Sequence, residues 1–267
     1  IDWSQVPDFD FFSYSFPCTD ISNAGLQKGL SEGSGTRSSL LWECCRAIEK
    51  KMPKYLLMEN VKGGVQQFVA KLEQPEVPGT VGAIVANCNP FTLGHRYLVE
   101  QAAAQVDTLH LFVLSEDKSF FPAADRMMLV KQGVADLKNV IVHPTGDYLI
   151  SAATFPTYFI KDKDRIPQIR CQLDLEVFAN HFAPALGITR RFVGTEPLSP
   201  VTDAYNRQMM DFLPKKGIEV TLVERKTMDG GPISASRVRA LLEERKWEEL
   251  SRLVPPTTLA YLQERFA

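Results

Sequence analysis

Short apolar runs alternate with longer stretches of helical periodicity along most of the chain. The runs are rich in β-branched residues and have the length of strands that are buried on both faces, which is typical of parallel sheets. We expect these strands at residues 81–86, 108–114, 140–142, 191–193 and 218–223. The intervening stretches predict helices from about Thr92 and at residues 123–134, 166–182 and 203–213. This alternation predicts an α/β fold with a doubly wound, Rossmann-like parallel sheet.

A shorter pattern of the same kind precedes that sheet. It predicts a strand at 9–16, a Gly/Ser-rich loop at 25–36, a helix at 37–51 and a strand at 55–58, which together form a separate βαβ fragment. Residues 74–79 contain two prolines and a glycine, which indicates a linker. We therefore expect an amino-terminal fragment at 1–62, a linker at 63–80 that includes a short helical stretch, and the main domain at 81–267.

Composition narrows the class of protein. The 267 residues carry a net charge of -2, and acidic and basic residues are mixed, so no basic stripe favours DNA. No apolar run approaches the ~20 residues of a membrane span, and the first ten residues do not resemble a signal peptide. The five cysteines form no CxxC pair and no zinc-ligand spacing with histidine, which favours reduced thiols. We expect a cytoplasmic protein without membrane association.

The turn after residues 81–86 carries the first candidate site. Thr92 can cap the following helix, whose free N–H groups in the first turn favour an anion. Gly94 would let a ligand approach the backbone, and His95 lies in the same turn. Taken alone, these residues could equally be a capping threonine beside a solvent-exposed histidine.

A second candidate site lies at residues 230–239. Two glycines and a proline lead into a helix that is opened by Ser234 and Ser236 and continues with Arg237 and Arg239. Such a start gathers hydroxyls, backbone N–H groups and guanidinium groups around one phosphate cluster. A capping serine with a solvated arginine face is the alternative, but two such helix starts in one chain favour phosphate binding.

These two stretches resemble the signatures of the nucleotidyltransferase superfamily. Thr92-Leu93-Gly94-His95 is similar to T/HxGH, and residues 233–239 are similar to ISSTxxR, with Ala235 in place of a serine. The resemblance implies that ATP is bound with the histidine facing its α-phosphate. The expected catalytic residues are His95, Thr92, Lys118 and Arg239. The expected nucleotide-binding residues are Asn89, Pro90, Phe91, Gly94, Arg126, Gly194, Glu196, Ser234 and Ser236.

From about Leu57 to its end, the chain resembles citrate lyase ligase. The similar stretches include SEDKSFFPAADR at 115–126, GDYLISAATFPTYFIK at 146–161 and LVPPTTLAYL at 253–262. The resemblance implies that ATP and acetate form acetyl-adenylate with loss of pyrophosphate. The acetyl group then passes to the thiol of the phosphoribosyl-dephospho-CoA prosthetic group on citrate lyase acyl carrier protein. Mg²⁺ would bridge the ATP phosphates, and an aromatic run at 155–159 could wall the acetate site.

Residues 1–62 instead resemble the cytosine-C5 DNA methyltransferases, through Phe16-Pro17-Cys18 and Glu59-Asn60-Val61. In that family the cysteine is the nucleophile and the glutamate contacts the base, here Cys18 and Glu59. The resemblance includes neither the strand that binds S-adenosylmethionine nor a target-recognition region, so we expect an inactive fragment joined to a different protein. It stands in place of the acetyltransferase-like domain of the ligase.

Two alternatives to an acid–thiol ligase follow from these patterns. One is a DNA (cytosine-5)-methyltransferase remnant that still binds DNA, and the other is a nucleotide-binding module that docks on an acyl carrier protein without turnover. The remaining histidines, at 110, 143 and 181, share no metal-ligand spacing, and we expect them to be structural. No metal-binding residues are predicted.

Overall fold

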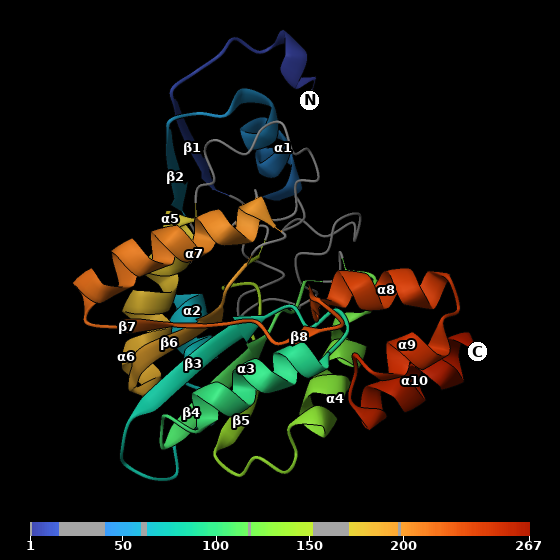
Figure 1. The fold of residues 1–267 in the computed structure, drawn as a ribbon. Coiled ribbons are helices and arrows are strands. Elements are labelled where there is room, and N and C mark those ends of the chain that lie inside the picture. The colour runs from blue at the N-terminus through green and yellow to red at the C-terminus, as the bar shows by residue number, and fades with distance from the viewer. Residues whose placement is uncertain (1, 16–40, 60–62, 117–118, 152–170, 197–198) are drawn as a thin grey trace.

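Five parallel strands form the central sheet of the computed structural model (Figure 1). The structure describes residues 2–15, 41–59, 63–116, 119–151, 171–196 and 199–267. All five predicted strands are confirmed, and the strands at 140 and 191 are longer than expected. They are β3 (Val81–Ala86), β4 (Thr108–Val113), β5 (Val140–Pro144), β6 (Ile188–Gly194) and β7 (Glu219–Val223).

The strand order β5-β4-β3-β6-β7 confirms the doubly wound topology. The chain enters the sheet at the central strand β3, moves outward through β4 and β5, and then crosses back to β6 and β7. In such a sheet a crevice opens at the carboxyl ends of the two strands where the direction of winding changes. Here those ends are Ala86 of β3 and Gly194 of β6, which belong to neighbouring strands.

Helices cover both faces of the sheet, which explains why its strands are apolar on both sides. On one face, α3 (Leu93–Ala103) and α4 (Ala123–Gly133) pack against Ile84, Leu109 and Leu111. The other face packs Ala83 and Phe112 into a second apolar cluster. The helices that contribute to that cluster are α2 (Gly63–Val69), α5 (Gln172–Val177), the π-helical turn η5 (Phe178–Phe182), α6 (Ala183–Leu186) and α7 (Pro200–Phe212).

The helix predicted at 166–182 lies only partly within the described residues. Its described part begins at Gln172, passes through the π-helical turn and continues to Leu186, four residues beyond the expected end. Gly187 then adopts a left-handed conformation with φ of 67°, which glycine tolerates and which ends the helix.

The carboxy-terminal part forms a third packed group beside the sheet (Figure 1). A short antiparallel pair, β8 (Thr227–Met228) and β9 (Gly231–Pro232), leads into α8 (Ala235–Glu243). The helices α9 (Trp247–Ser251) and α10 (Pro256–Phe266) follow. Their apolar side chains enclose Phe121 and pack against Leu93 at the start of α3, so α8 is held close to the carboxyl edge of the sheet.

The amino-terminal βαβ fragment is confirmed over its described parts. After a short 3-10 turn (Trp3–Gln5), β1 (Phe11–Ser15) and β2 (Tyr55–Glu59) pair in parallel, and α1 (Leu41–Lys51) lies between them in sequence. These two strands form a sheet of their own and do not pair with the five-stranded sheet. Cys18 and the Gly/Ser-rich loop lie outside the described residues, as do residues 37–40 of the predicted helix.

The segment expected to be a linker is only partly one. Residues Val65, Phe68, Val69 and Leu72 pack into the core on the α2 side of the sheet. Their spacing of three, one and three residues places them on one face of a helix, which is why the segment folds against the domain. From Glu73 to Thr80 the chain has no helix or strand and most residues are exposed, so the connecting piece is shorter than predicted.

Within the described residues, none of the helices combines the length and the apolar character that crossing a membrane requires.

Candidate functional site

A cavity of about 380 Å³ lies where the sheet topology predicts a crevice, at the carboxyl ends of β3 and β6. Nine of the predicted site residues line it, and they come from the turn after β3, the first turn of α3, the end of β6 and the start of α8. These residues are Asn89, Thr92, Gly94, His95, Gly194, Glu196, Ser234, Ser236 and Arg239. The fold thus brings together the two motifs that the sequence separates by more than a hundred residues.

Thr92 and His95 cap α3 reciprocally. The Thr92 hydroxyl accepts the backbone N–H of His95 at 3.3 Å, and the backbone N–H of Thr92 donates to Nδ1 of the His95 ring at 3.1 Å. Because Nδ1 accepts this hydrogen bond, it carries no proton, and the neutral ring must carry its proton on Nε2. The ring also stacks on Phe91, with ring centroids 5.9 Å apart and an interplanar angle of 16°.

The His95 ring stays neutral near physiological pH. Burial lowers its pKa to about 4, and the nearby positive charge of Arg225 lowers the pKa in the same direction. The side chain is therefore a fixed hydrogen-bond donor at the cavity rather than a group that exchanges protons near pH 7.

Gly94 is required by a contact within the protein. A Cβ atom at this position would lie 2.8 Å from the carbonyl oxygen of Ile233, which immediately precedes the cap of α8. We expected Gly94 to admit a ligand to the backbone, but the group that comes close there is the protein's own main chain. The glycine lets the first turn of α3 approach the start of α8.

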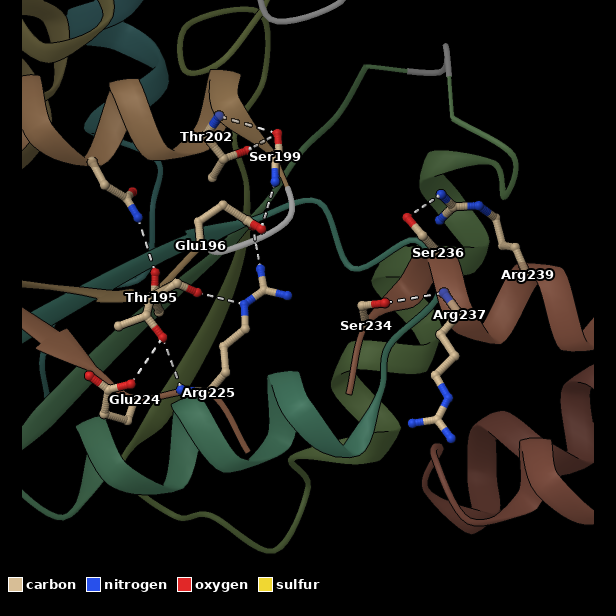
Figure 2. A network of polar contacts seen from close by, with 12 residues as sticks. Thr195, Glu196, Ser199, Thr202, Glu224, Arg225, Ser234, Ser236, Arg237 and Arg239 are labelled. Atoms are coloured by element: carbon tan, nitrogen blue, oxygen red, sulfur yellow. Dashed lines mark hydrogen bonds and ion pairs between the residues drawn. The ribbon is translucent and has the colours of Figure 1, made fainter. Parts of the chain in front are cut away.

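The second motif forms the other side of the cavity. Ser234 caps α8 by accepting the backbone N–H of Arg237 at 3.1 Å. Arg239 donates to the carbonyl oxygen of Asn89 and, at 3.1 Å, to the hydroxyl of Ser236. Figure 2 shows the Arg239 and Arg237 side chains leaving α8 in different directions. Arg237 donates instead to the Met228 carbonyl, at 3.0 Å. Of these two arginines, only Arg239 lines the cavity.

A polar network ties together the carboxyl ends of β6 and β7 (Figure 2). Arg225 forms an ion pair with Glu196 and donates from Nε to the Thr195 carbonyl at 2.6 Å. The other carboxylate oxygen of Glu196 accepts the backbone N–H of Ser199 at 3.0 Å. Glu196 lines the cavity, but its carboxylate is engaged in holding this edge together.

Three predicted nucleotide-binding residues lie outside the cavity. Pro90 is buried, and Phe91 is fully buried against Gly133 beneath the His95 ring. Arg126 is also fully buried. Its guanidinium donates hydrogen bonds to main-chain carbonyls of the surrounding loops, namely those of Asn87, Leu114, Glu116 and Phe121. Arg126 therefore positions the loop after β3 rather than facing a ligand.

Lys118 and the aromatic residues at 155–159 lie outside the described residues.

The sequence analysis missed three basic residues that line the cavity, namely Arg191, Arg225 and Lys226. Arg225 and Lys226 come one residue after the end of β7, and Lys226 lies over the ring of Tyr97, 5.7 Å from its centroid. The position of these two at the carboxyl end of a parallel strand was a usable signal. Arg191 lies inside a strand, where the apolar pattern gives no hint of a functional cation.

His110 and His143 form a buried pair on the neighbouring strands β4 and β5. Nδ1 of His110 lies 2.8 Å from Nε2 of His143, and burial lowers the pKa of each ring to about 4. Neither residue lines the cavity. No group of three or more potential metal ligands occurs in the described part of the chain, so the pair has a structural place in the core.

Comparison with known proteins divides the chain into two parts. The family described as the citrate lyase ligase C-terminal domain matches residues 81–262. The family described as C-5 cytosine-specific DNA methylase matches residues 1–71. Over 62 residues, or 23% of this chain, the sequence is 73% identical to the type II methyltransferase M2.ScrFI of Lactococcus lactis subsp. cremoris, of which it covers 17%.

Longer matches are to citrate (pro-3S)-lyase ligases. Identity to the protein of Klebsiella pneumoniae is 44% over 260 residues, which cover 96% of this chain and 71% of that protein. Identity to the protein of Haemophilus influenzae is 47%, covering 81% of this chain and 67% of the relative. Identity to the protein of Escherichia coli is also 47%, covering 78% and 61%. The chain thus spans about two thirds of the length of these relatives.

Two solved structures show weaker similarity. TmcAL of Thermotoga maritima, solved with alpha-thio ATP, is 14% identical with a TM-score of 0.42, covering 69% of this chain and 55% of that one. A putative nicotinate-nucleotide adenylyltransferase from Vibrio parahaemolyticus is 17% identical with a TM-score of 0.43, covering 70% and 99%.

Proposed function

This chain belongs to the citrate lyase ligase family, and we propose that it activates acetate with ATP and passes the acetyl group to citrate lyase acyl carrier protein. The acceptor would be the thiol of the phosphoribosyl-dephospho-CoA prosthetic group of that carrier. The observation that carries the proposal is the meeting of His95 and Arg239 on one cavity at the switch point of the sheet. We place the reaction in the cytoplasm.

The first half-reaction is displacement at the α-phosphorus of ATP. A carboxylate oxygen of acetate forms a bond to phosphorus while the bond to pyrophosphate breaks, and no proton needs to move. Such a reaction depends on alignment and on stabilising charge rather than on a protein nucleophile. His95, with its proton on Nε2, would donate to an α-phosphate oxygen.

The leaving group would be held at the start of α8. Arg239 and Ser236 lie together there, and the first-turn N–H groups of the helix favour negative charge. A guanidinium that binds the β- and γ-phosphates stabilises the charge that accumulates on pyrophosphate as it departs. Ser234, which caps the same helix, fixes this end of the cavity.

Mg²⁺ would neutralise phosphate charge in this reaction. No group of three acidic, histidine or cysteine ligands exists within the described residues, so these residues offer no cage for the ion. This fits the usual behaviour of Mg²⁺, which is commonly held through substrate phosphates and water with few protein ligands.

The acetyl group would pass directly from the adenylate to the carrier thiol: the carbon–sulfur bond forms, the bond to AMP breaks, and the thiol loses its proton. The one described cysteine on the cavity, Cys88, is buried, and burial raises the pKa of its thiol to about 12. A thiol with that pKa is scarcely ionised at neutral pH and makes a poor nucleophile. We therefore propose no acetyl-enzyme intermediate on Cys88.

Acetate-dependent exchange of labelled pyrophosphate into ATP, measured with the full chain, tests the proposal. We expect exchange that requires both acetate and Mg²⁺, and acetylation of the carrier protein detected as a mass increase. Binding of ATP without exchange would instead favour a nucleotide-binding module. Methyl transfer from S-adenosylmethionine to cytosine in DNA would favour the methyltransferase remnant, although the 62-residue match covers only 17% of that relative.

A further inference from the structure

Arg191 is a buried cation that lines the cavity with two donor nitrogens that have no hydrogen-bond partner among the described residues. Its side chain projects from β6, and the residue is only 2% exposed. Nε and Nη1 have no hydrogen-bond partner, and no ion pair to Arg191 occurs among the described residues. Leaving buried donors without a hydrogen-bond partner is costly, so chains rarely retain them unless a ligand or a function needs them.

The groups nearest to Arg191 leave part of its hydrogen-bonding capacity unused. Burial lowers the pKa of its guanidinium, and the nearby Tyr205 and Asp174 act in the opposite direction. Its guanidinium lies over the ring of Phe178, 4.6 Å from the centroid. The Asp174 carboxylate accepts the backbone N–H of Ile150 at 2.5 Å and the hydroxyl of Tyr205 at 2.6 Å, and it makes no ion pair with Arg191. The Asp174–Tyr205 pair thus lies in a fixed arrangement beside the guanidinium, whose Nε and Nη1 donors remain available.

This end of the cavity differs from the end that carries His95. Arg191 stands opposite Ala83 of β3, three positions before the strand ends at Ala86, which corresponds to a depth of roughly 10 Å along the strand. The lining on the α7 side of the sheet combines the apolar residues Val85, Leu114, Ile150 and Met209 with the polar residues Thr202, Tyr205 and Asn206. A small ligand with one anionic end and an apolar remainder suits these walls.

We propose that Arg191 binds the carboxylate of the acid substrate at the inner end of the cavity, with the methyl group packed against Ile150 and Met209. The proposal rests on the proposed function, since it places the acid of that reaction. A guanidinium holds a carboxylate through two donors in one plane, which a lysine cannot reproduce.

The geometry also suits the reaction. One carboxylate oxygen stays on Arg191 while the other attacks the α-phosphorus, and the electron pair of the broken bond leaves with pyrophosphate. The oxygen that remains on Arg191 becomes the carbonyl oxygen of acetyl-adenylate. Neutralising the carboxylate beforehand reduces its repulsion from the ATP phosphates.

The test compares Arg191→Met and Arg191→Lys with Arg190→Gln. Arg190 is the matched control because it neighbours Arg191 on β6, pairs with Glu219 at 3.1 Å and does not line the cavity. We expect Arg191→Met to raise the acetate KM of pyrophosphate exchange by about tenfold or more, the typical value of a charged hydrogen bond. ATP affinity should stay within about twofold, Arg191→Lys should be intermediate, and Arg190→Gln should be unchanged.

The thermal stability of Arg191→Met is a second measurement, and it distinguishes binding of the substrate by Arg191 from a purely structural role of this residue. Because Arg191→Met removes two buried donors that have no hydrogen-bond partner, its Tm should stay close to that of the unaltered chain. An unchanged acetate KM in this variant would overturn the proposal, and so would a loss of ATP affinity as large as the loss for acetate.

Direct acetate binding separates this site from the proposed function. Binding of ¹³C-acetate is measured by NMR in the presence of α,β-methylene-ATP, which cannot release pyrophosphate. Binding that is lost in Arg191→Met supports the site even if the unaltered chain shows no exchange, in which case only the proposed function fails. Exchange by the unaltered chain with equal acetate binding in Arg191→Met overturns the site alone. If the unaltered chain neither exchanges nor binds acetate, both fail.

Discussion

Arg239 donates a hydrogen bond to the main-chain carbonyl of Asn89, a residue 150 positions earlier in the chain. This contact joins the start of α8 to the turn between β3 and α3. Asn89 in turn accepts the backbone N–H of Phe121 through its side chain at 2.9 Å, so the turn is fixed from two sides. The two motifs are therefore one structural unit, and changing either should affect the other.

Arg239→Ala should weaken binding of ATP and pyrophosphate by about tenfold or more, because their phosphates would lose the charged hydrogen bonds that the guanidinium donates. The acetate KM should change much less. Arg237→Ala is the control, since Arg237 bonds to the Met228 carbonyl and does not line the cavity. Calorimetry that finds equal losses for ATP and acetate would place Arg239 elsewhere in the mechanism.

His95→Ala should lower acetate-dependent exchange by ~10²-fold or more, the usual effect of removing a preorganised donor to a reacting group. Because the pKa of His95 lies at about 4, its contribution should not change with pH between 5.5 and 8. Circular dichroism would confirm that the variant folds. A titration near pH 6.5 in the exchange rate, abolished by His95→Gln, would instead mean that His95 acts in its charged form.

Gly94→Ala should impair folding and nucleotide binding together. The added Cβ would lie 2.8 Å from the Ile233 carbonyl, and overpacking of this kind typically costs about 1–3 kcal/mol. Gly231→Ala is the control, because a Cβ there meets only an Arg237 nitrogen at 3.8 Å. Urea unfolding and ATP titration of both variants measure the effect. Full stability in Gly94→Ala would show that the two helix starts can separate freely.

Acid should destabilise the fold through the buried histidine pair. The pKa of His110 and of His143 is about 4 in the folded chain, below the value of about 6.5 in an unfolded one. Between these pH values the unfolded state binds more protons. The stability that the neutral histidine pair contributes is therefore fully present above pH 6.5 and is lost as the pH falls to about 4.

For one histidine titrating alone, the loss by pH 4 is on the order of 3 kcal/mol. Urea unfolding at pH 7, 5.5 and 4.5 measures the loss. A His110→Leu, His143→Leu double variant should show a shallower dependence on pH, whereas the His181→Gln control should behave like the unaltered chain. An unchanged slope in the double variant would contradict the assignment.

The sequence predicts the sheet well because strands buried on both faces appear as continuous apolar runs. It also predicts the helix starts at Thr92 and Ser234, since capping depends on local residue types. It does not predict where long side chains point. Arg126 was expected on the ligand, yet its donors are used by loop carbonyls, and the buried Arg191 was missed because its surroundings come from distant segments.

The packing of residues 65–72 against the main domain was not predicted, because two prolines dominated the interpretation of residues 63–80. The apolar spacing from Val65 to Leu72 was visible in the sequence, but the surface that covers it is assembled only in the fold. Phe68 packs on Tyr148 and on Phe182, with ring centroids 5.1 and 6.0 Å apart.

This packing determines where the amino-terminal fragment can be removed. Deleting residues 1–62 should leave ATP binding by residues 63–267 within a few-fold, because β1 and β2 do not pair with the five-stranded sheet. Deleting residues 1–74 should instead expose the core, because it removes Phe68, Val69 and Leu72. Loss of a large core side chain typically lowers the free energy of unfolding by about 2–5 kcal/mol, so the longer deletion should cost several kcal/mol.

Comparison of the two deletions by thermal unfolding and ATP titration separates the possible outcomes. The longer deletion should melt at a lower temperature and aggregate more readily, while the shorter one should match the full chain. Cys18→Ala in the full chain should change neither exchange nor carrier acetylation, because the fragment lacks the rest of a methyltransferase. Loss of ATP binding on removal of residues 1–62 alone would show that the βαβ fragment supports the ligase domain, and equal stability of both deletions would show that α2 contributes nothing to the core.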